Sequence, residues 1–268
     1  MKTIRAVIGL LLTVQLAGAA AGKEVIEMGA VKDGVKITVV FDNKTVSKDY
    51  EAGYGFACVV EKNGKKILFD TGCCGKTLLS NMKKAGIKPK EINIIVLSHS
   101  HWDHTGGLFD FLKENSNVTV YVLPSFSKKF KQEIKNSGAK FKESAGYTEI
   151  IKGVFTTGEL GSKIKEQSLI IDSSEGPVLI TGCAHPGIVS IVKSAEASHK
   201  QSISVILGGL HLMEKSSAQT DRIITSLKKL GIKKVVPLHC TGDRQSRMII
   251  KEFGAGDKKT GAGSKIKI

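Results

Sequence analysis

The sequence has few of the residues that cross-link or stiffen small folds. Five cysteines in 268 residues are too few to form the main covalent framework of a chain this long. Only 5 prolines occur, against 29 glycines, and the hydrophobic fraction is 41%. This composition excludes collagen-like and disordered chains and favours a compact protein with many tight turns. Stability must therefore come from burial, and the length allows one large domain or two small ones.

Arginine and aromatic residues are also scarce, although the chain carries a net charge of +15. Aromatic residues make up 6% of the chain, and lysine supplies almost all of the positive charge. The arginines are Arg5, Arg222, Arg244 and Arg247. Proteins that read nucleic acids add arginine forks and interleaved aromatic platforms. We therefore expect no nucleic-acid partner, and we interpret the lysines as a solvated surface that attracts a small anionic substrate.

The N-terminal apolar run is too short for a comfortable transmembrane span. Lys2 and Arg5 precede the apolar residues 6–12, and a run of small residues, 17–21, follows before Lys23. A basic start, a short apolar stretch and an Ala-rich end are typical of a secretory signal peptide. We predict such a signal over residues 1–21 and a mature domain over 22–268, with an uncleaved anchor or a buried first helix as alternatives. The signal predicts export to the periplasm or the extracellular medium, without stable membrane insertion after cleavage.

Hydrophobic patterning predicts a mixed α/β architecture. Alternating or fully apolar segments predict strands at 35–41, 55–61, 66–69, 92–97, 118–123, 168–172, 178–181, 203–207 and 235–238. Helical spacing predicts helices at 76–85, 127–136, 187–199, 220–230 and 242–253. An Asn-Gly pair at 63–64 predicts a hairpin turn, and the tail 264–268 alternates like an edge strand. Together these elements indicate one α/β (α+β) domain of two similar lobes, with two mixed sheets and helices packed outside them.

Six of the seven histidines fall at the ends of apolar strands or in glycine-flanked loops: His99, His101, His104, His185, His211 and His239. Such positions hold functional side chains on a rigid scaffold. His99 and His101 are two residues apart, so they point the same way from an extended segment. Asp103 and His104 follow and can face a second ion about 3.5–4 Å away. We predict a metal centre here; the alternative is a loop of capping residues and satisfied histidines.

The run from His99 to His104, His-Ser-His-Trp-Asp-His, with Phe-Asp-Thr-Gly at 69–72, resembles the metallo-beta-lactamase superfamily. The resemblance extends over nearly all of the mature chain and implies a four-layer αββα sandwich. It also implies one ion bound by His99, His101 and a third histidine, and another bound by Asp103, His104 and a last histidine. By order and context, the third is His185 and the last is His239.

Three further segments resemble a narrower branch of that superfamily. They are Thr-Gly-Cys-Ala-His-Pro-Gly-Ile at 181–188, Gly-Gly-Leu-His-Leu at 208–212 and Pro-Leu-His-Cys-Thr-Gly at 237–242. They look like the branch named after the archaeal dihydropterin–ribofuranosylaminobenzene phosphate synthase. Members of that branch elsewhere are commonly hydrolase-like proteins of unknown substrate.

The chain departs from the wider superfamily at Cys183, where many members carry a bridging aspartate. Cys183 is a thiolate ligand, a redox-sensitive thiol or, in the interpretation we favour, a small core residue behind the ligands. Asp70 is expected to accept the ring N–H of a ligand histidine, unless it is a turn residue bonded to its own backbone. His211 is an extra ligand or a donor to developing negative charge. The centre is thus expected to hold one or two divalent ions, with zinc preferred to iron or manganese.

These residues predict a metal-dependent hydrolase. A metal-bound hydroxide would attack a small anionic ester, phosphoester or lactone, with Asp103 holding or deprotonating the water and His211 steadying the charge. The alternative is a transferase of the synthase type, in which the metal assists departure of diphosphate. Export argues against that alternative, since pterin biosynthesis is expected inside the cell.

Overall fold

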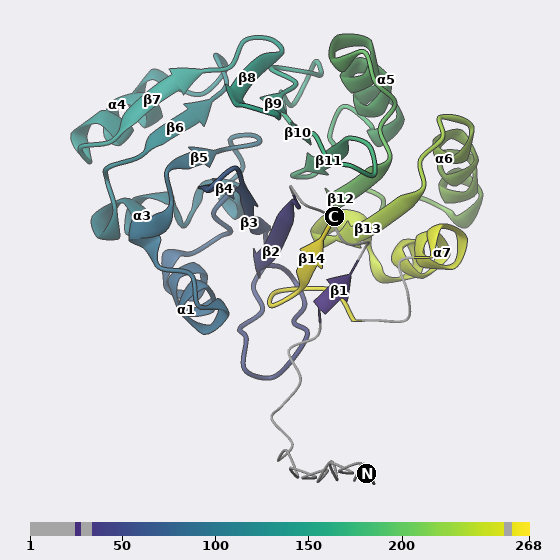
Figure 1. The fold of residues 1–268 in the computed structure, drawn as a ribbon, viewed down its shortest axis with the longest axis horizontal. Helices are drawn as coiled ribbons and strands as arrows, with labels where there is room; N and C mark the ends of the chain where they lie inside the picture. The colour runs from purple at the N-terminus through teal and green to yellow at the C-terminus, as the bar shows by residue number, and fades with distance from the viewer. Residues whose placement is uncertain (1–24, 28–33, 255–258) are drawn as a thin grey trace, which may run out of the picture.

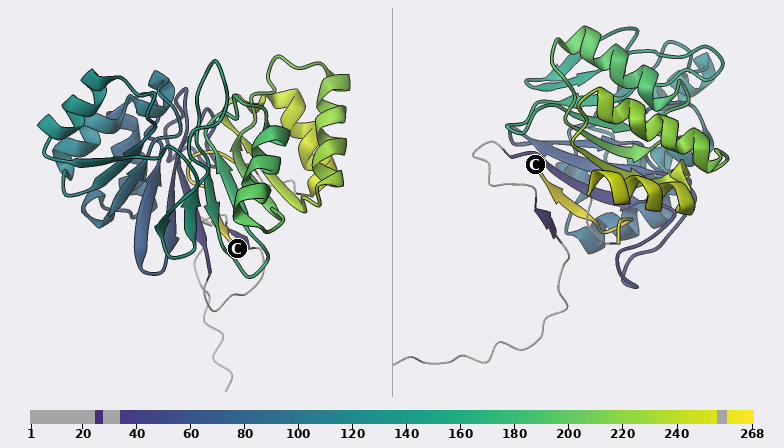
Figure 2. Two further views of the ribbon diagram at one scale, coloured as in Figure 1. Left: turned by 90° about the horizontal axis from the view of Figure 1, so that it is seen from above. Right: turned by 90° about the vertical axis from the view of Figure 1, so that its right-hand side faces the viewer.

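The computed structural model of the chain describes residues 25–27, 34–254 and 259–268. The predicted signal peptide, 1–21, lies outside these residues. Two β-sheets pack face to face, and helices cover the outer face of each sheet (Figure 1 and Figure 2). The layers run helix, sheet, sheet, helix, so the predicted αββα sandwich is confirmed. Among the helices of the described ranges, none combines the length and the apolar character needed to span a membrane.

The first sheet has eight strands and is built mainly from the N-terminal half. In spatial order they are β1 (Val25–Glu27), β14 (Lys265–Lys267), β2 (Lys36–Phe41), β3 (Ala57–Lys62), β4 (Lys65–Phe69), β5 (Ile94–Val96), β6 (Thr119–Val122) and β7 (Lys140–Glu143). The strands from β14 to β4 are antiparallel, and those from β4 to β7 are parallel. The predicted hairpin joins β3 to β4 through Asn63 and Gly64, both with positive φ, as a tight turn requires.

The second sheet has six strands. In spatial order they are β13 (Lys234–Leu238), β12 (Val205–Gly209), β11 (Val178–Thr181), β10 (Leu169–Ile171), β9 (Val154–Thr156) and β8 (Thr148–Ile151). The neighbours β11, β12 and β13 run parallel, whereas the other pairs are antiparallel. The carboxyl ends of β11, β12 and β13 therefore meet at one edge of the sheet, and the loops that follow them lie side by side.

Three helices cover each sheet. On the first sheet these are α1 (Gly75–Ala85), α3 (Leu108–Glu114) and α4 (Lys128–Asn136); on the second they are α5 (Ile188–His199), α6 (Ser217–Lys229) and α7 (Asp243–Phe253). A short helix, α2 (Trp102–Thr105), and two 3₁₀ turns, η1 (Pro89–Glu91) and η2 (His239–Thr241), complete the fold. The helix ends follow local chemistry: Ser127 caps α4, and Gly86 ends α1 with a φ of 77°.

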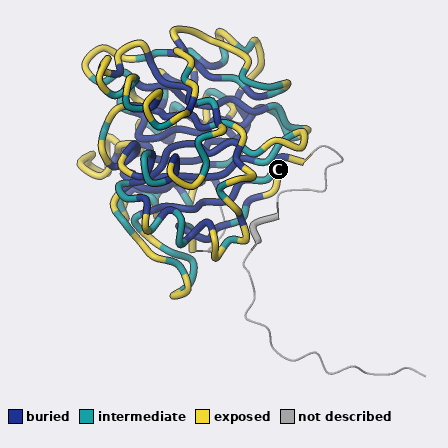
Figure 3. The backbone as a smooth tube through the Cα atoms, turned by 90° about the vertical axis from the view of Figure 1, so that its left-hand side faces the viewer, coloured by how far each residue is buried: buried dark blue, intermediate teal, exposed yellow. Residues whose placement is uncertain are grey.

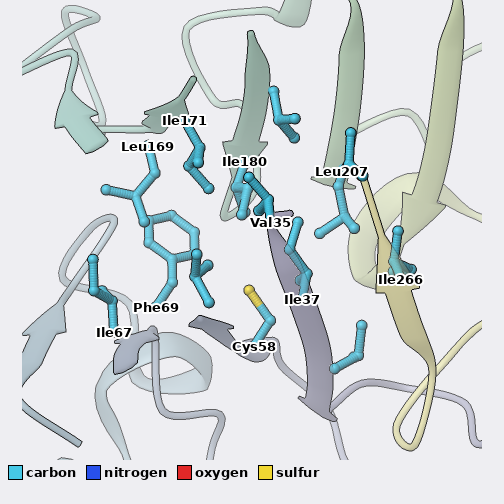
Figure 4. Close-up of a cluster of buried hydrophobic side chains, with 14 of the residues drawn as sticks. Val35, Ile37, Cys58, Ile67, Phe69, Leu169, Ile171, Ile180, Leu207 and Ile266 are labelled. Atoms are coloured by element: carbon cyan, nitrogen blue, oxygen red, sulfur yellow. The ribbon is translucent and has the colours of Figure 1, made fainter. Parts of the chain in front are cut away.

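The main core lies between the two sheets. Phe69 and Cys58 of the first sheet meet Leu169 and Ile180 of the second, all fully buried (Figure 4). The strands of both sheets are mostly buried (dark blue in Figure 3), whereas the outer loops and the outer faces of the helices are exposed (yellow). Each fully buried aliphatic or aromatic side chain contributes about 1.5–3 kcal/mol. The sheets are thus docked by apolar burial, and the loops at their shared edge are held in fixed relation.

Two expectations about strands need correction. The tail 264–268 does not form an edge strand, because β14 pairs with β2 on one side and with β1 on the other. Ile266 and Ile268 are the buried hydrophobic residues of this alternating tail, and such alternation does not distinguish an inner strand from an edge. The sequence analysis also missed β7, β8 and β9, which have three or four residues each. Segments this short carry too few repeats for periodicity to register.

Candidate metal centre

Asp70, at the end of β4, ties together the residues that follow β5. Its side chain is fully buried. Oδ1 accepts the backbone N–H of Ser98 at 2.7 Å, and Oδ2 accepts both the Ser98 hydroxyl and His104 Nδ1, each at 2.7 Å. Since the Ser98 hydroxyl donates to Asp70, its oxygen accepts the proton on His99 Nδ1, 2.9 Å away. One carboxylate therefore orients the rings of His99 and His104.

His239, which follows β13, is held in the same way by the residues at the end of β2. Its Nδ1 donates to Asn43 Oδ1 at 2.9 Å, and its backbone N–H donates to Asp42 Oδ1 at 2.7 Å. With Nδ1 engaged, the lone pair of each of His99, His104 and His239 lies on Nε2. Second-sphere hydrogen bonds of this kind fix the tautomer of metal-binding histidines and raise their basicity.

The predicted ligands gather into two adjoining groups. The first contains His99, His101 and His185, and the second contains Asp103, His104, His239 and Cys183. Within each group, the candidate ligand atoms all lie within 4.8 Å of one another. The groups are neighbours, since the ring centroids of His99 and His104 are 4.2 Å apart. The structure thus brings together all six residues proposed as ligands, in the division that the family resemblance implied.

The donor atoms in both groups fit a cation. Among the described residues, His99 Nε2 and His185 Nε2 are buried without any hydrogen-bond partner, although buried polar atoms are normally paired. His104 Nε2 and His239 Nε2 lie 3.3 Å apart, and Asp103 Oδ2 is 3.2 Å from His239 Nε2. A divalent ion would satisfy these converging lone pairs.

The electrostatics favour the unprotonated forms that bind metal. Burial and the neighbouring histidines hold the pKa of His99 well below its usual value, and they lower the pKa of His185 to about 4. Burial raises the pKa of Asp103, but His239 and His104 outweigh burial and leave the net pKa below normal. Neutral imidazoles at His99 and His185 and an ionised carboxylate at Asp103 are therefore favoured, and these are metal-binding forms. Burial lowers the pKa of His104, but the Asp70 carboxylate outweighs burial and leaves that pKa raised.

Glu166 is a functional residue that the sequence analysis missed. It is buried, and its carboxylate accepts the backbone N–H of Cys183, Ala184 and His185 at 2.8–2.9 Å. It thus holds the loop that presents two of the candidate ligands. Its flanking residues, Lys165 and Gln167, make it look like part of a polar surface segment, so no periodic signal identifies it. Asp42 and Asn43 were also missed, although their place after an apolar strand is the pattern that drew attention to Asp70.

Cys183 and His211 lie at the centre rather than apart from it. Cys183 Sγ is 3.2 Å from His104 Nε2, so the thiol faces the ligand atoms and is not packed in the apolar core. His211 is exposed at the rim, with its ring centroid 4.4 Å from that of His185. A hydrogen bond with Cys183 lowers the pKa of the Cys240 thiol well below its usual value. The centre therefore contains sulfur as well as nitrogen and oxygen donors.

Gly182 has a specific steric role. A Cβ built there would lie 2.2 Å from Ser98 Oγ and 2.9 Å from Asp70 Oδ2. Real Cβ atoms do not approach other atoms so closely, so only glycine leaves room for the hydrogen bonds that orient His99 and His104. Strain also collects here: Asp70, Ala184 and His239 have positive φ without being glycine, a conformation that costs about 1–3 kcal/mol each and clusters at functional sites.

The sequence of the scaffold matches a known family. The sequence profile described as the Metallo-beta-lactamase superfamily matches residues 50–239, which is more than half of the chain. This chain belongs to the metallo-beta-lactamase superfamily. The match ends at His239 and contains every candidate ligand of both groups. Members of this superfamily are enzymes and typically bind divalent metals, so the chain has the scaffold of a metal-dependent enzyme.

Relatives within the superfamily point to the narrower branch. The chain is 32% identical to the 7,8-dihydropterin-6-methyl-4-(beta-D-ribofuranosyl)-aminobenzene-5'-phosphate synthase of Methanocaldococcus jannaschii, with 83% of this chain and 95% of the relative covered. A solved structure described as a metal-dependent hydrolase of the beta-lactamase superfamily is 29% identical, with a TM-score of 0.66 over 82% of this chain and 93% of the other. A metallo-beta-lactamase fold protein from Bacillus subtilis shares the fold at 12% identity, with a TM-score of 0.66 over 88% of this chain and all of the other.

Proposed function

We propose that this enzyme is a metal-dependent hydrolase of a small anionic ester, phosphoester or lactone, with zinc as the preferred ion. The observation that carries the proposal is the convergence of two ligand groups, in which the buried Nε2 atoms of His99 and His185 have no hydrogen-bond partner among the described residues. A divalent ion in such groups lowers the pKa of a bound water towards neutrality and polarises the oxygen of the substrate. Imidazole nitrogen with one carboxylate oxygen is a donor set that suits zinc, and also iron or manganese.

A basic cavity beside the centre supports the anionic substrate class. The cavity has a volume of about 870 Å³, and His239 forms part of its wall. Lys44, Arg247 and Lys259 also line it. Lys44 is paired with Asp243, whereas no ion pair involves Arg247 or Lys259 among the described residues. Asp42 and Asp243 line the same cavity, and Arg247 and Lys259, which make no ion pair there within 4 Å, would attract a phosphate or carboxylate group of the substrate.

Asp103 and His211 are the side chains proposed to act on the reactants. Asp103 remains ionised, and its Oδ2 faces the second ligand group, so it can accept a proton from an attacking water. His211 stands exposed at the rim beside His185, from where a ring N–H can donate to the negative charge that develops on the substrate. Three further side chains are proposed to position the ligands and not to touch the substrate. Asp70 and Asn43 hold the metal-binding histidines, and Glu166 holds the ligand loop, residues 183–185.

The test is a substrate panel with and without chelator. It includes phosphomonoesters, phosphodiesters, lactones, β-lactams and a pterin diphosphate. We expect hydrolysis of at least one class, lost with chelator and restored by zinc, and lost in His101→Ala and Asp103→Asn. Matched controls are His199→Ala and Asp110→Asn, since His199 on α5 and Asp110 on α3 belong to neither ligand group. Activity that survives both changes in the centre would contradict the proposal.

A second candidate is a transferase of the synthase type, favoured by the 32% identity to the archaeal synthase over 95% of its length. In that reaction the same centre would bind a diphosphate leaving group, while an aromatic carbon or amine attacks the pterin methylene. Mass spectrometry of the products separates the two candidates. Incubation of the pterin diphosphate with an aminobenzene acceptor yields a coupled product from a transferase. A hydrolase releases only uncoupled products, either the pterin alcohol with diphosphate or the pterin monophosphate with phosphate.

Export is also proposed, on the basic, apolar and Ala-rich segments of residues 1–21. Cell fractionation and N-terminal sequencing of the native protein test it. A mature N-terminus near residue 22 in the exported fraction is expected. A native protein that retains Met1 and stays inside the cell would contradict export and would favour the transferase.

A further inference from the structure

A third cluster of donor atoms lies beside the two ligand groups. It consists of Cys183, His211 and Cys240, whose candidate ligand atoms are all within 4.8 Å of one another. The proposed hydrolysis uses neither thiol, and the wider family pattern gives Cys240 no role. Two sulfurs and one imidazole nitrogen form a softer set than the three imidazoles of the first group, or the two imidazoles, one carboxylate and one thiol of the second.

The positions of the three residues follow from the topology of the second sheet. Cys183 comes two residues after β11, His211 two residues after β12, and Cys240 two residues after β13. These strands are parallel neighbours, so the three loops leave the same edge of the sheet in the same direction. Equivalent positions on three adjacent strands thus place the donors together on a rigid scaffold.

The local backbone is shaped around the sulfur atoms. A Cβ at Gly209 would lie 2.8 Å from Cys240 Sγ and 2.3 Å from the carbonyl oxygen of Gly182, so glycine is needed where the thiol crosses β12. His211 itself has a φ of 52°, a left-handed conformation that a non-glycine residue adopts at a cost of about 1–3 kcal/mol. Such strain persists where the surrounding structure holds a side chain in a required position.

The thiols are not part of the apolar packing. Cys58 belongs to the hydrophobic cluster between the sheets, whereas Cys183 and Cys240 belong to none of the three clusters in the described residues, although both are buried. Their neighbours are polar: Cys183 Sγ lies 3.2 Å from His104 Nε2, and Cys240 Sγ lies 3.6 Å from the carbonyl oxygen of Cys183. The two thiols are therefore buried among other donor atoms, whereas His211 beside them is exposed. The site is reached from solvent on the side of His211.

We propose that Cys183, Cys240 and His211 form a third metal site, which binds a soft divalent ion of the zinc type through two thiolates and one imidazole nitrogen. Cys183 also belongs to the second ligand group, so its sulfur bridges that group and the third site. His211 has two ring nitrogens; one faces the thiols as a ligand, and the other N–H remains available to the substrate.

The third site shares Cys183 with the second ligand group and His211 with the proposed hydrolysis. The test therefore has a readout that does not depend on activity. Metal-free mature protein, reduced and kept without oxygen, is titrated with Co²⁺. Thiolate bound to Co²⁺ gives a near-ultraviolet charge-transfer band that imidazole and carboxylate ligands do not give. We expect the band in the unmodified protein, together with about one more bound ion per chain than in Cys240→Ser or His211→Ala.

Two controls separate ligation from folding. Cys58→Ser removes a thiol that lies in the apolar core and should leave the band and the stoichiometry unchanged. X-ray absorption at the zinc edge of the unmodified zinc-loaded protein needs no variant and should show sulfur at about 2.3 Å. A saturated cobalt protein without the band, zinc without sulfur, or equal stoichiometry in Cys240→Ser would each overturn the third site. None of these outcomes would affect the hydrolysis assay, so failure of the third site and failure of the proposed function are distinguishable.

Discussion

Glu166→Gln tests whether the ligand loop depends on a single buried carboxylate. Glu166 Oε1 accepts the N–H groups of Cys183 and Ala184, and Oε2 accepts that of His185. Glutamine can keep its carbonyl oxygen on the first two, but its NH₂ group then points at the His185 N–H. Two buried donors face each other in the variant, where the native protein has a charge-assisted hydrogen bond.

The expected loss of stability follows from two opposing effects. A hydrogen bond to a charged group contributes about 1.5–3 kcal/mol, and a buried donor left without a partner costs about 1–3 kcal/mol. Against this, burial raises the pKa of Glu166, so the ionised carboxylate is itself costly to bury and the neutral amide recovers part of that cost. We therefore expect the net destabilisation to be about 2 kcal/mol, which is less than the sum of the two penalties.

Urea denaturation of the metal-free proteins measures this loss. With a slope of about 3 kcal/mol per molar urea, the midpoint should fall by roughly 0.7 M. A competition titration against a chelator should also show metal affinity falling about 10–100-fold, the usual effect of removing a residue that orients a ligand. Glu252→Gln makes the same chemical change in an exposed ion pair with Lys228 and should shift neither quantity. Equal midpoints and affinities for Glu166→Gln and the native protein would refute the role given to this carboxylate.

Three further predictions concern the centre and its surroundings. Gly182→Ala should destabilise the protein by about 1–3 kcal/mol and weaken metal binding, because its Cβ would displace Ser98; Gly146→Ala, where a Cβ meets nothing within 4 Å, should do neither. Chelation should lower the melting temperature, and zinc at 100 times its Kd should restore about 2.7 kcal/mol; an unchanged melting temperature would argue against a metal centre. Mass spectrometry after alkylation of the folded protein should show Cys73 modified and Cys58 untouched, because Cys58 is buried away from the reagent whereas Cys73 is partly exposed; burial raises the pKa of both thiols.

The sequence predicted those parts of the fold in which the hydrophobic pattern of a strand or helix repeats several times along the segment. The strand 35–41, the Asn-Gly hairpin and the helices 187–199 and 242–253 each show several turns or alternations, and each is present with shifts of one or two residues at its ends. The strands β7, β8 and β9 have no such repeat. The position of β14 inside the sheet depends on which strands pair across the whole chain, and a local pattern does not contain that information.

The candidate ligands were predictable for a different reason. His99, His101 and His104 are close in sequence and follow a buried strand, so local spacing alone brings them together. Cys240 and Glu166 act through loops that meet only when β11, β12 and β13 align and the segment before β10 folds beside them. Their roles depend on long-range packing, and no spacing within the sequence encodes that packing.

The division of ligands between the two sheets has a consequence for stability. In the first group, His99 and His101 follow β5 of one sheet, whereas His185 follows β11 of the other. The second group likewise joins Asp103 and His104 to His239 across the same boundary. Ions in these groups would therefore link the two halves of the sandwich, and their binding energy would add to the docking of the sheets. The third site takes all of its donors from loops of the second sheet. An ion there should therefore change the chemistry of the centre without linking the two halves of the sandwich.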